Sequence, residues 1–225
     1  MDLQIYLRKE DLIMVLENNK IVLFFLLDGY ADWETGYTSA KLHNLGYSVH
    51  TISLKLSAVK SQGNFQTSID YSLDTFHDYQ NLAALLLIGG TGWGDQHLIK
   101  GYDRNLYDKN SSKSIKGFID YSLSIPNVVV AAICDGATFM ADNGYLDEIP
   151  HTGNSLAHLS EKAPGYEGKK LFQEKQAVSS DRIITANGTA PLEFSREILI
   201  SLNELGSKER VNEWYMLNKK GSFPS

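Results

Sequence analysis

Three continuous apolar runs of seven residues constrain the fold of this chain more than any other feature of its sequence. They cover residues 21–27, 82–88 and 128–134 and consist almost entirely of Val, Ile, Leu, Phe and Ala. Apolar character without polar alternation is typical of a strand that is buried on both faces. A membrane span would need about 20 such residues. The runs therefore predict the central strands of a parallel sheet.

Segments with helical periodicity separate these strands. Trp33, Tyr37 and Ala40 recur at helical spacing, and Gly46 follows where a C-terminal glycine ends a helix. Alternating strands and helices imply one parallel sheet with helices on both faces. Residues 65–71 are expected to form a small hairpin or an edge excursion. The other expected elements are strands at 47–53, 127–133, 177–179 and 182–186, and helices at 111–123, 135–143 and 195–205, the last ended by Gly206.

The length of 225 residues suits one α/β domain. We expect an N-terminal extension over residues 1–19 and the domain itself over 20–205. Residues 206–225 are expected to form a C-terminal helix that packs on the domain, because Val211, Trp214 and Tyr215 recur at helical spacing.

The net charge and the number of cysteines indicate which partners and which cellular compartment suit this protein. The net charge is −6 and Lys and Arg are not clustered, which argues against nucleic acid and against an anionic membrane surface. Cys134 is the sole cysteine, so it can form neither an intramolecular disulfide nor a zinc knuckle or an iron–sulfur cluster. The N-terminus does not read as a signal peptide. We therefore expect a cytoplasmic protein.

Neither a metal nor a cofactor is expected. The glycine-rich loop at residues 89–94 lacks both G-x-x-x-x-G-K-[ST] and G-x-G-x-x-G, so it predicts no phosphate or dinucleotide binding. Five histidines show no metal-ligand spacing with carboxylates and read as ordinary surface or packing residues. They are His43, His50, His77, His97 and His158.

The segment Val128–Met140 is the most informative for chemistry. Cys134 lies between a buried strand and a helix, with the small residues Ala132 and Gly136 two positions away on either side. This arrangement is typical of a nucleophile elbow, in which the N–H groups of the new helix stabilise a thiolate and lower the pKa of the thiol. The alternative is a buried structural cysteine at the end of a strand.

Two further groups follow other strands toward the same edge of the sheet. The Gly89-Gly90 pair offers an N–H that could hold an oxyanion, or forms a plain turn. Glu34 either complements a helix N-terminus or lies near the thiol, partly buried and with a raised pKa.

Several motifs together resemble the ThiJ/PfpI family, which includes intracellular-protease-like and DJ-one-like proteins of the class I glutamine amidotransferase-like superfamily. The resemblance runs in order over about residues 20–205 and implies a flavodoxin-like three-layer sandwich, a reactive cysteine and a homodimer. The motifs are YADWE (30–34), LLLIGGTGW (85–93), AAICDGATFMADNGYLD (131–147), HTGN (151–154) and TANGTAPLEFSREIL (185–199).

Carried over by this resemblance, Cys134 is the reactive cysteine, Glu34 its carboxylate partner and Gly90 the oxyanion-hole glycine. His151 is similar to the histidine beside the thiol in DJ-one-like members, or is a strand-end histidine with a backbone partner. Protease-like members have His directly after the cysteine, whereas this chain has Asp135. A carboxylate opposes thiolate formation, which argues against a classical peptidase. Asp135 could instead cap the helix or orient His151.

Three hypotheses of function follow. In the first, Cys134 attacks a small carbonyl or amide substrate, as in a hydrolase, glyoxalase or deglycase. The N–H groups of Gly90 and Asp135 hold the oxyanion, and Glu34 or His151 moves the proton. In the second, the protein is a redox sensor or stress-response protein that oxidises Cys134 without turnover. In the third, it is a binding module that keeps the pocket without catalysis.

Overall fold

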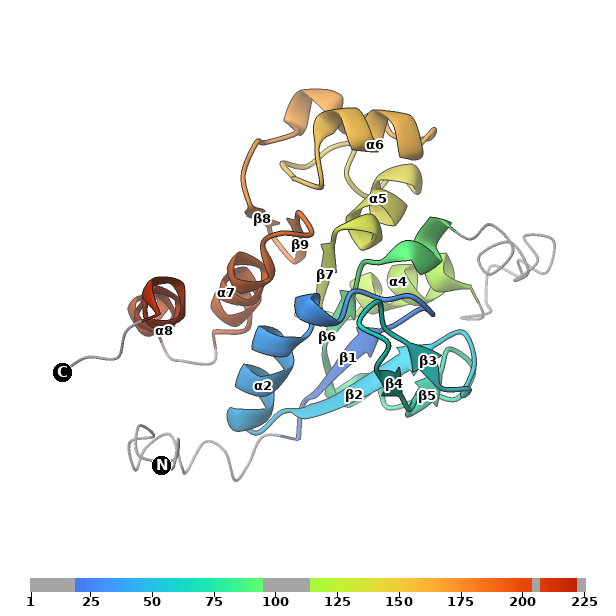
Figure 1. The fold of residues 1–225 in the computed structure, drawn as a ribbon, viewed down its shortest axis with the longest axis vertical. Helices are drawn as coiled ribbons and strands as arrows, with labels where there is room; N and C mark the ends of the chain where they lie inside the picture. Colours follow the sequence, from blue (N-terminus) through green and yellow to red (C-terminus); the bar gives the residue numbers. More distant parts are fainter. Residues whose placement is uncertain (1–18, 95–113, 204–206, 222–225) are drawn as a thin grey trace.

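The computed structural model describes residues 19–94, 114–203 and 207–221 and has the expected α/β architecture, a seven-stranded sheet between helices (Figure 1). The strand order is β5-β2-β1-β6-β7-β9-β8, and all neighbours are parallel except β8 and β9. The strands are β1 (Ile21–Phe25), β2 (Ser48–Ser53), β5 (Tyr71–Ser72), β6 (Leu82–Leu87), β7 (Val129–Ile133), β8 (Ala177–Ser180) and β9 (Ile183–Ala186).

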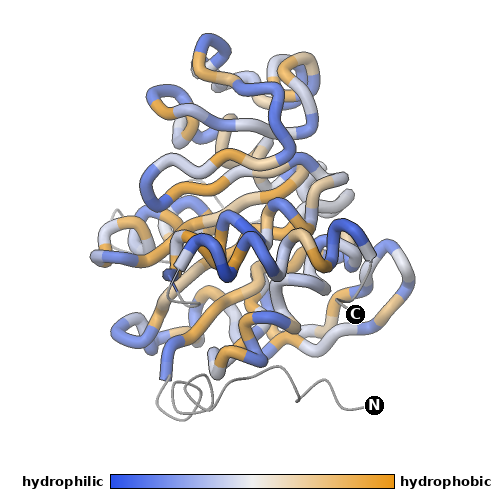
Figure 2. The backbone as a smooth tube through the Cα atoms, turned by 90° about the vertical axis from the view of Figure 1, so that its left-hand side faces the viewer, coloured by the Kyte–Doolittle hydropathy of each residue, from blue (hydrophilic) through white to orange (hydrophobic). Residues whose placement is uncertain are grey.

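Helices cover both faces of this sheet, so the central strands are buried on both sides. In β1, Leu23 and Phe25 belong to one hydrophobic cluster and Val22 and Phe24 to the other. This explains the unbroken apolar runs, and Figure 2 shows the strands as mainly hydrophobic segments inside the molecule. One face carries α4 (Ile115–Ser124), α5 (Asp135–Asp142) and α6 (Leu156–Lys162), and the other carries α2 (Gly36–Asn44), α7 (Pro191–Leu202) and α8 (Lys208–Lys220).

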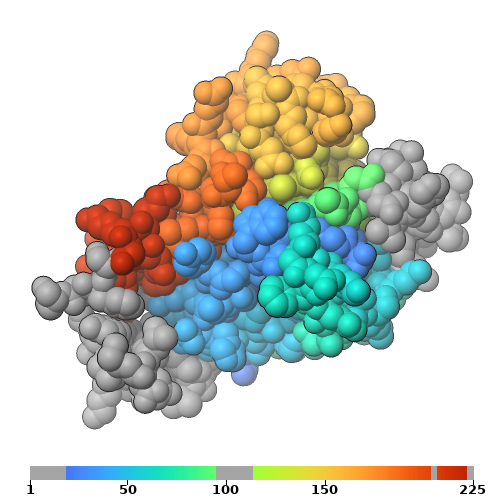
Figure 3. Space-filling view, viewed as in Figure 1, coloured from blue at the N-terminus to red at the C-terminus, as the bar shows by residue number. Residues whose placement is uncertain are grey.

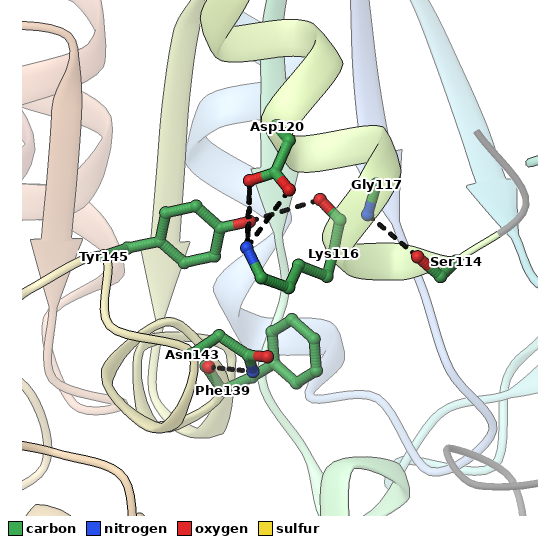
Figure 4. Close-up of polar contacts among 7 residues, drawn as sticks. All are labelled: Ser114, Lys116, Gly117, Asp120, Phe139, Asn143 and Tyr145. Atoms are coloured by element: carbon green, nitrogen blue, oxygen red, sulfur yellow. Dashed lines mark hydrogen bonds and ion pairs between the residues drawn. The ribbon is translucent and has the colours of Figure 1, made fainter. Parts of the chain in front are cut away.

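Polar contacts join α4 to the chain that follows α5 (Figure 4). The Tyr145 hydroxyl lies 2.5 Å from Asp120 Oδ1 and 3.2 Å from the carbonyl oxygen of Lys116. The Lys116 ammonium lies 3.1 Å from Asp120 Oδ2 and 4.8 Å from the Tyr145 ring centre. These contacts fix the far end of α5, the helix that begins directly after Cys134.

The structure differs from the expected elements at several places. The helix expected to end at Gly206 ends at Leu202, because Asn203 adopts a left-handed conformation (φ 54°). Helix α6 was not expected at all; in Figures 1 and 3 its segment lies at the top of the molecule, above α5. The expected excursion at 65–71 contributes to a two-stranded sheet of β3 (Val59–Lys60) and β4 (Gln66–Thr67) and to the edge strand β5.

Short 3-10 helices fill several of the connections. They are η2 (Asp32–Glu34), η3 (Tyr79–Asn81), η4 (Thr91–Gly94) and η6 (Gly168–Leu171).

The expected extension over residues 1–19 lies outside the described residues, apart from residue 19. Within the described ranges, no helix is long and apolar enough to cross a membrane, and no group of three or more His, Cys, Asp or Glu could hold a metal ion.

Candidate active site

Cys134 occupies a sharp bend between β7 and α5. Its backbone has φ 57° and ψ −125°, a conformation that is uncommon for any residue except glycine. The bend is held on both sides, because the Cys134 N–H donates to the Ala186 carbonyl at 3.0 Å and the Cys134 carbonyl accepts from the N–H of Ala137 at 3.1 Å. A Cβ on Gly136 would lie 2.5 Å from the Leu87 carbonyl oxygen, so the bend requires a glycine there. The side chain of Cys134 remains partly exposed.

The Glu34 carboxyl group is completely buried beside this bend. Its Oε2 accepts from the Gly89 N–H at 2.8 Å, whereas Oε1 has no hydrogen-bond partner of ordinary geometry among the described residues. Burial raises the pKa of Glu34 to about 7, and the negative charge of Asp135 adds to the rise. The Gly89 N–H and the Cys134 side chain act in the opposite direction without cancelling it.

Two glycines leave the space in which the thiol and this carboxyl group meet. A Cβ on Gly89 would lie 3.0 Å from Cys134 Sγ and 2.8 Å from Glu34 Oε2. A Cβ on Gly188 would lie 2.9 Å from Sγ and 3.1 Å from Glu34 Oε1. Real Cβ atoms essentially never approach other atoms as closely as the shortest of these distances. Both positions therefore need glycine for Cys134 and Glu34 to lie as they do.

The expected lowering of the thiol pKa is not what this environment produces. Burial, together with the negative charges of Glu34 and Asp135, raises the pKa of Cys134 to about 11. The Asn154 side chain and the Asp135 N–H favour the thiolate but are outweighed. Cys134 and Glu34 thus form a coupled pair, and near neutral pH a proton stays on the sulfur while Glu34 gains or loses its own.

Asn154 is a site residue that the sequence reasoning missed, and Gly188 is one to which it assigned no role. Asn154 Nδ2 donates to Cys134 Sγ at 3.4 Å, and its Oδ1 accepts from the Gly188 N–H at 2.9 Å. The Trp33 indole N–H donates to the Gly188 carbonyl at 3.0 Å, while the Trp33 side chain is half exposed. Both residues stand in quoted motifs, HTGN and TANGT. Gly188 follows β9 and could have been identified by that position, whereas Asn154 follows no strand and belongs to no pattern that marks it as a site residue.

Backbone N–H groups near the thiol are partly occupied. The Cys134 N–H bonds to Ala186, and the Gly89 N–H bonds to Glu34. The Gly90 N–H has no hydrogen-bond partner among the described residues, and the Asp135 N–H contacts the thiol itself. Gly90 has φ 127°, which glycine adopts readily. Neither Gly90 nor Asp135 therefore donates its N–H to a carbonyl or carboxylate oxygen among the described residues.

His151 is not brought into contact with Cys134. The ring is fully buried, Nδ1 lies 2.7 Å from the Ile149 carbonyl oxygen, and Nε2 lies 2.6 Å from the Tyr166 hydroxyl. Its ring also packs edge-on against Tyr166 and Phe172. Burial lowers the pKa of His151 despite the Ile149 carbonyl. Both ring nitrogens are thus engaged, in the manner of a structural histidine.

Asp135 turns toward α6. Its Oδ1 accepts from the Thr138 hydroxyl at 3.2 Å and lies 2.8 Å from Nε2 of His158. His158, which read as an ordinary surface or packing histidine, is therefore the imidazole that contacts the elbow, in place of His151. The sequence analysis did not predict the contact between His158 and Asp135, because it did not predict helix α6, which carries His158.

The sequence and the structure of this chain are similar to those of known proteins. A family model described as the DJ-1/PfpI family matches residues 20–201. The chain is 34% identical over 205 residues to the Uncharacterized protease YdeA of Bacillus subtilis (strain 168), which covers 91% of this chain and 93% of that protein. A thiJ/pfpI family protein from Bacillus anthracis has a similar structure, with a TM-score of 0.75, 29% identity and coverage of 91% and 92%. A DJ-1 superfamily protein from Agrobacterium tumefaciens gives a TM-score of 0.69, 27% identity and coverage of 89% and 99%.

Proposed function

The chain belongs to the DJ-1/PfpI family, and from this premise we propose that it is an enzyme in which the Cys134 thiol attacks the electrophilic carbon of a small carbonyl or amide substrate. One observation carries the proposal: a partly exposed thiol in a strained elbow lies against a buried carboxyl group that has no cation beside it in the part of the chain that the structure describes. Strongly perturbed titratable groups cluster at functional sites.

Glu34 is the group that accepts the thiol proton in this mechanism. The raised pKa of the thiol means that little thiolate exists beforehand, so the proton has to leave as the S–C bond forms. The Glu34 carboxylate contacts the thiol, and its pKa of about 7 suits a group that takes and returns a proton near neutral pH. We assign this role to Glu34 and not to His151, because both nitrogens of His151 are engaged elsewhere.

The remaining steps follow from the same geometry. As Sγ bonds to the carbonyl carbon, the carbonyl oxygen becomes an oxyanion that the N–H groups of Gly90 and Asp135 stabilise. With an aldehyde, protonation of that oxygen gives a thiohemiacetal. With an amide, the C–N bond breaks, Glu34 returns its proton to the leaving amine, and water hydrolyses the thioester to a carboxylic acid and the free thiol.

The experiment compares turnover by the wild type, C134S and E34Q on methylglyoxal, small amides and short peptides. Peptides are included because the relative from Bacillus subtilis is named a protease. C134S should lower kcat/KM by about 10³-fold or more. H151Q is the matched control and should retain turnover if it keeps its fold. Equal turnover by C134S and the wild type would exclude the mechanism.

A second candidate is a redox sensor that uses the same pair. Cys134 is the sole cysteine and has no partner for a resolving disulfide. Two equivalents of peroxide would oxidise the thiol to a sulfinate and be reduced to water. Protonated Glu34, with its raised pKa, could then donate a hydrogen bond to the sulfinate. Intact mass after mild peroxide should show a gain of two oxygens that C134S abolishes, and no gain would exclude this function.

The oligomeric state and the cellular compartment of this protein remain predictions. The family resemblance implies a homodimer, and we propose that this chain forms a homodimer and is located in the cytoplasm. Light scattering of the purified protein tests the dimer, since a monomer over the working concentration range would contradict it.

A further inference from the structure

Two residues of one short segment contact two consecutive residues of the elbow. Asn154 Nδ2 lies 3.4 Å from Cys134 Sγ, and His158 Nε2 lies 2.8 Å from Asp135 Oδ1. Ser155 stands between them as the cap of α6, and its hydroxyl accepts from the His158 N–H at 3.0 Å. The start of α6 is therefore fixed against the start of α5, with the imidazole one helical turn from the amide.

Asp135 places a negative charge beside the thiol. Its charge raises the pKa of both Cys134 and Glu34, although burial is the larger cause for each. Thr138 donates a hydrogen bond to this carboxylate but carries no charge. Without a compensating cation, Asp135 would oppose the ionisation on which Cys134 chemistry depends.

Among the described residues, His158 is the group in direct contact with Asp135 that can carry a positive charge. Lys162 acts on Asp135 only at longer range, and its ammonium lies 2.8 Å from the neighbouring Glu161. Glu161 in turn interacts electrostatically with His158. The side chains of His158 and Asp135 are 29% and 30% exposed, so solvent protons can reach the pair while the surrounding protein still limits screening.

We propose that His158 is a positioning residue for Cys134: its contact with Asp135 holds that carboxylate against the start of α5 and, when the imidazole is protonated, offsets the negative charge next to the thiol. The inference rests on the proposed function of Cys134 as a nucleophile. His158 contacts no reacting atom and acts through Asp135.

This role has a signature in the pH dependence of thiol reactivity. An imidazole compensates a neighbouring carboxylate by charge only while it carries a proton, so we expect His158 to favour the thiolate in acidic solution and to lose that effect in alkaline solution. Glu34 titrates near pH 7 and also changes the thiol environment. It is present in the wild type and in His158 variants alike, and repeating the comparison in the D135N background isolates the part that acts through Asp135.

The experiment measures the rate of iodoacetamide alkylation of Cys134, the sole cysteine, from pH 6 to pH 9. H158Q should be slower than the wild type at pH 6 by about three- to tenfold, because a tenfold change in thiolate corresponds to one pKa unit. The two rates should converge by pH 9. H158K restores a permanent cation and should exceed H158Q over the whole range. In the D135N background, H158Q should have no further effect.

His50 provides the matched control, because its Nδ1 lies 3.5 Å from Asp70 Oδ2 in a second His–Asp pair on the β2 side of the sheet. H50Q should leave the alkylation profile unchanged. A rate ratio of wild type to H158Q that stays constant with pH, or equal rates for H158K and H158Q, would overturn the inference. Alkylation needs no turnover, so an inactive wild-type enzyme would contradict the proposed function alone.

Discussion

Glu34 and Glu193 are both almost completely buried, at 0% and 4% exposure, yet their surroundings are opposite. Glu193 on α7 accepts from Lys219 Nζ at 2.7 Å and from the Tyr215 hydroxyl at 2.8 Å, both on α8. Burial by itself raises the pKa of Glu193, but these two partners reverse the effect and lower it. Glu34 has no cation beside it among residues 19–94, 114–203 and 207–221, and its pKa rises to about 7.

The difference separates a structural carboxylate from a functional one. A buried charge that is paired and hydrogen-bonded holds elements together, here α7 to α8 (Figure 3). A buried carboxyl group without a cation costs stability and persists where chemistry needs it. The predictions below test whether the two glutamates divide in this way.

The largest expected effect is on turnover. E34Q removes the proton acceptor and should lower kcat by about 10²- to 10⁴-fold. E193Q should leave kcat unchanged and lower the free energy of unfolding by about 1 kcal/mol, because two partly buried hydrogen bonds lose a charged acceptor. Steady-state kinetics and urea unfolding of both variants provide the test. Similar losses of kcat in E34Q and E193Q would contradict the assignment of a functional role to Glu34 and a structural role to Glu193.

The pH dependence of stability should also have opposite signs at the two sites. The pKa of Glu34 rises from 4.5 to about 7 on folding, so its ionisation destabilises the protein increasingly from pH 4.5 to 7, by about 3 kcal/mol above that range. E34Q should therefore be more stable than the wild type at pH 8 and equal to it at pH 4.

Glu193 has a lowered pKa in the folded protein, so it contributes stability above its unfolded pKa that is lost as the pH falls through the folded value. E193Q should be less stable than the wild type at pH 7 and approach it under acidic conditions. Urea midpoints measured from pH 4 to pH 8 give both curves. Parallel curves for E34Q and the wild type would contradict the raised pKa of Glu34.

A smaller effect is expected when the space between thiol and carboxyl group is filled. The added methyl of G188A would lie 2.9 Å from Cys134 Sγ, so either the thiol or the Gly188 loop has to move. Alkylation of Cys134 should slow by about tenfold because the sulfur is displaced or covered, and the overpacking should also lower the free energy of unfolding by about 1–3 kcal/mol. G36A is the matched control, because nothing lies within 4 Å of its Cβ position. An unchanged alkylation rate in G188A would contradict the close approach of Gly188 to Cys134 Sγ.

The smallest effect is expected at Asn154. Its amide donates to Sγ and lowers the pKa of the thiol, so N154A should slow alkylation at pH 7 by about two- to tenfold. N154D replaces the donor with a negative charge and should slow it further. A faster rate in N154D than in N154A would contradict the contact.

The sequence was sufficient for the fold and for the backbone of the site. The apolar runs identify the central strands because the clusters on both faces of the sheet demand apolar residues at every position. The small residues around Cys134 identify the elbow because Gly136 approaches the Leu87 carbonyl. Helix α6 escaped prediction because it has seven residues and one fully buried side chain, Leu159, which leaves little periodicity to detect.

The electrostatics of the site could not be read in the same way. A thiol at a helix start is expected to be acidic, but its pKa depends on how deeply the sulfur is buried and on which charges face it. Neither quantity follows from residue spacing. The contact between His158 and Asp135 is equally invisible, because the two residues meet only when α6 packs on α5.

The most direct test of the central claim is the protonation state of Glu34. Infrared difference spectroscopy between pH 5 and pH 9 should show a buried carboxylic acid that loses its proton near pH 7 and that is absent from E34Q. C134S, which removes the thiol from the pair, should shift this titration. A wild-type protein in which Glu34 is already fully ionised at pH 5 would contradict the account, because Glu34 would then be an ordinary carboxylate with no proton to exchange with Cys134.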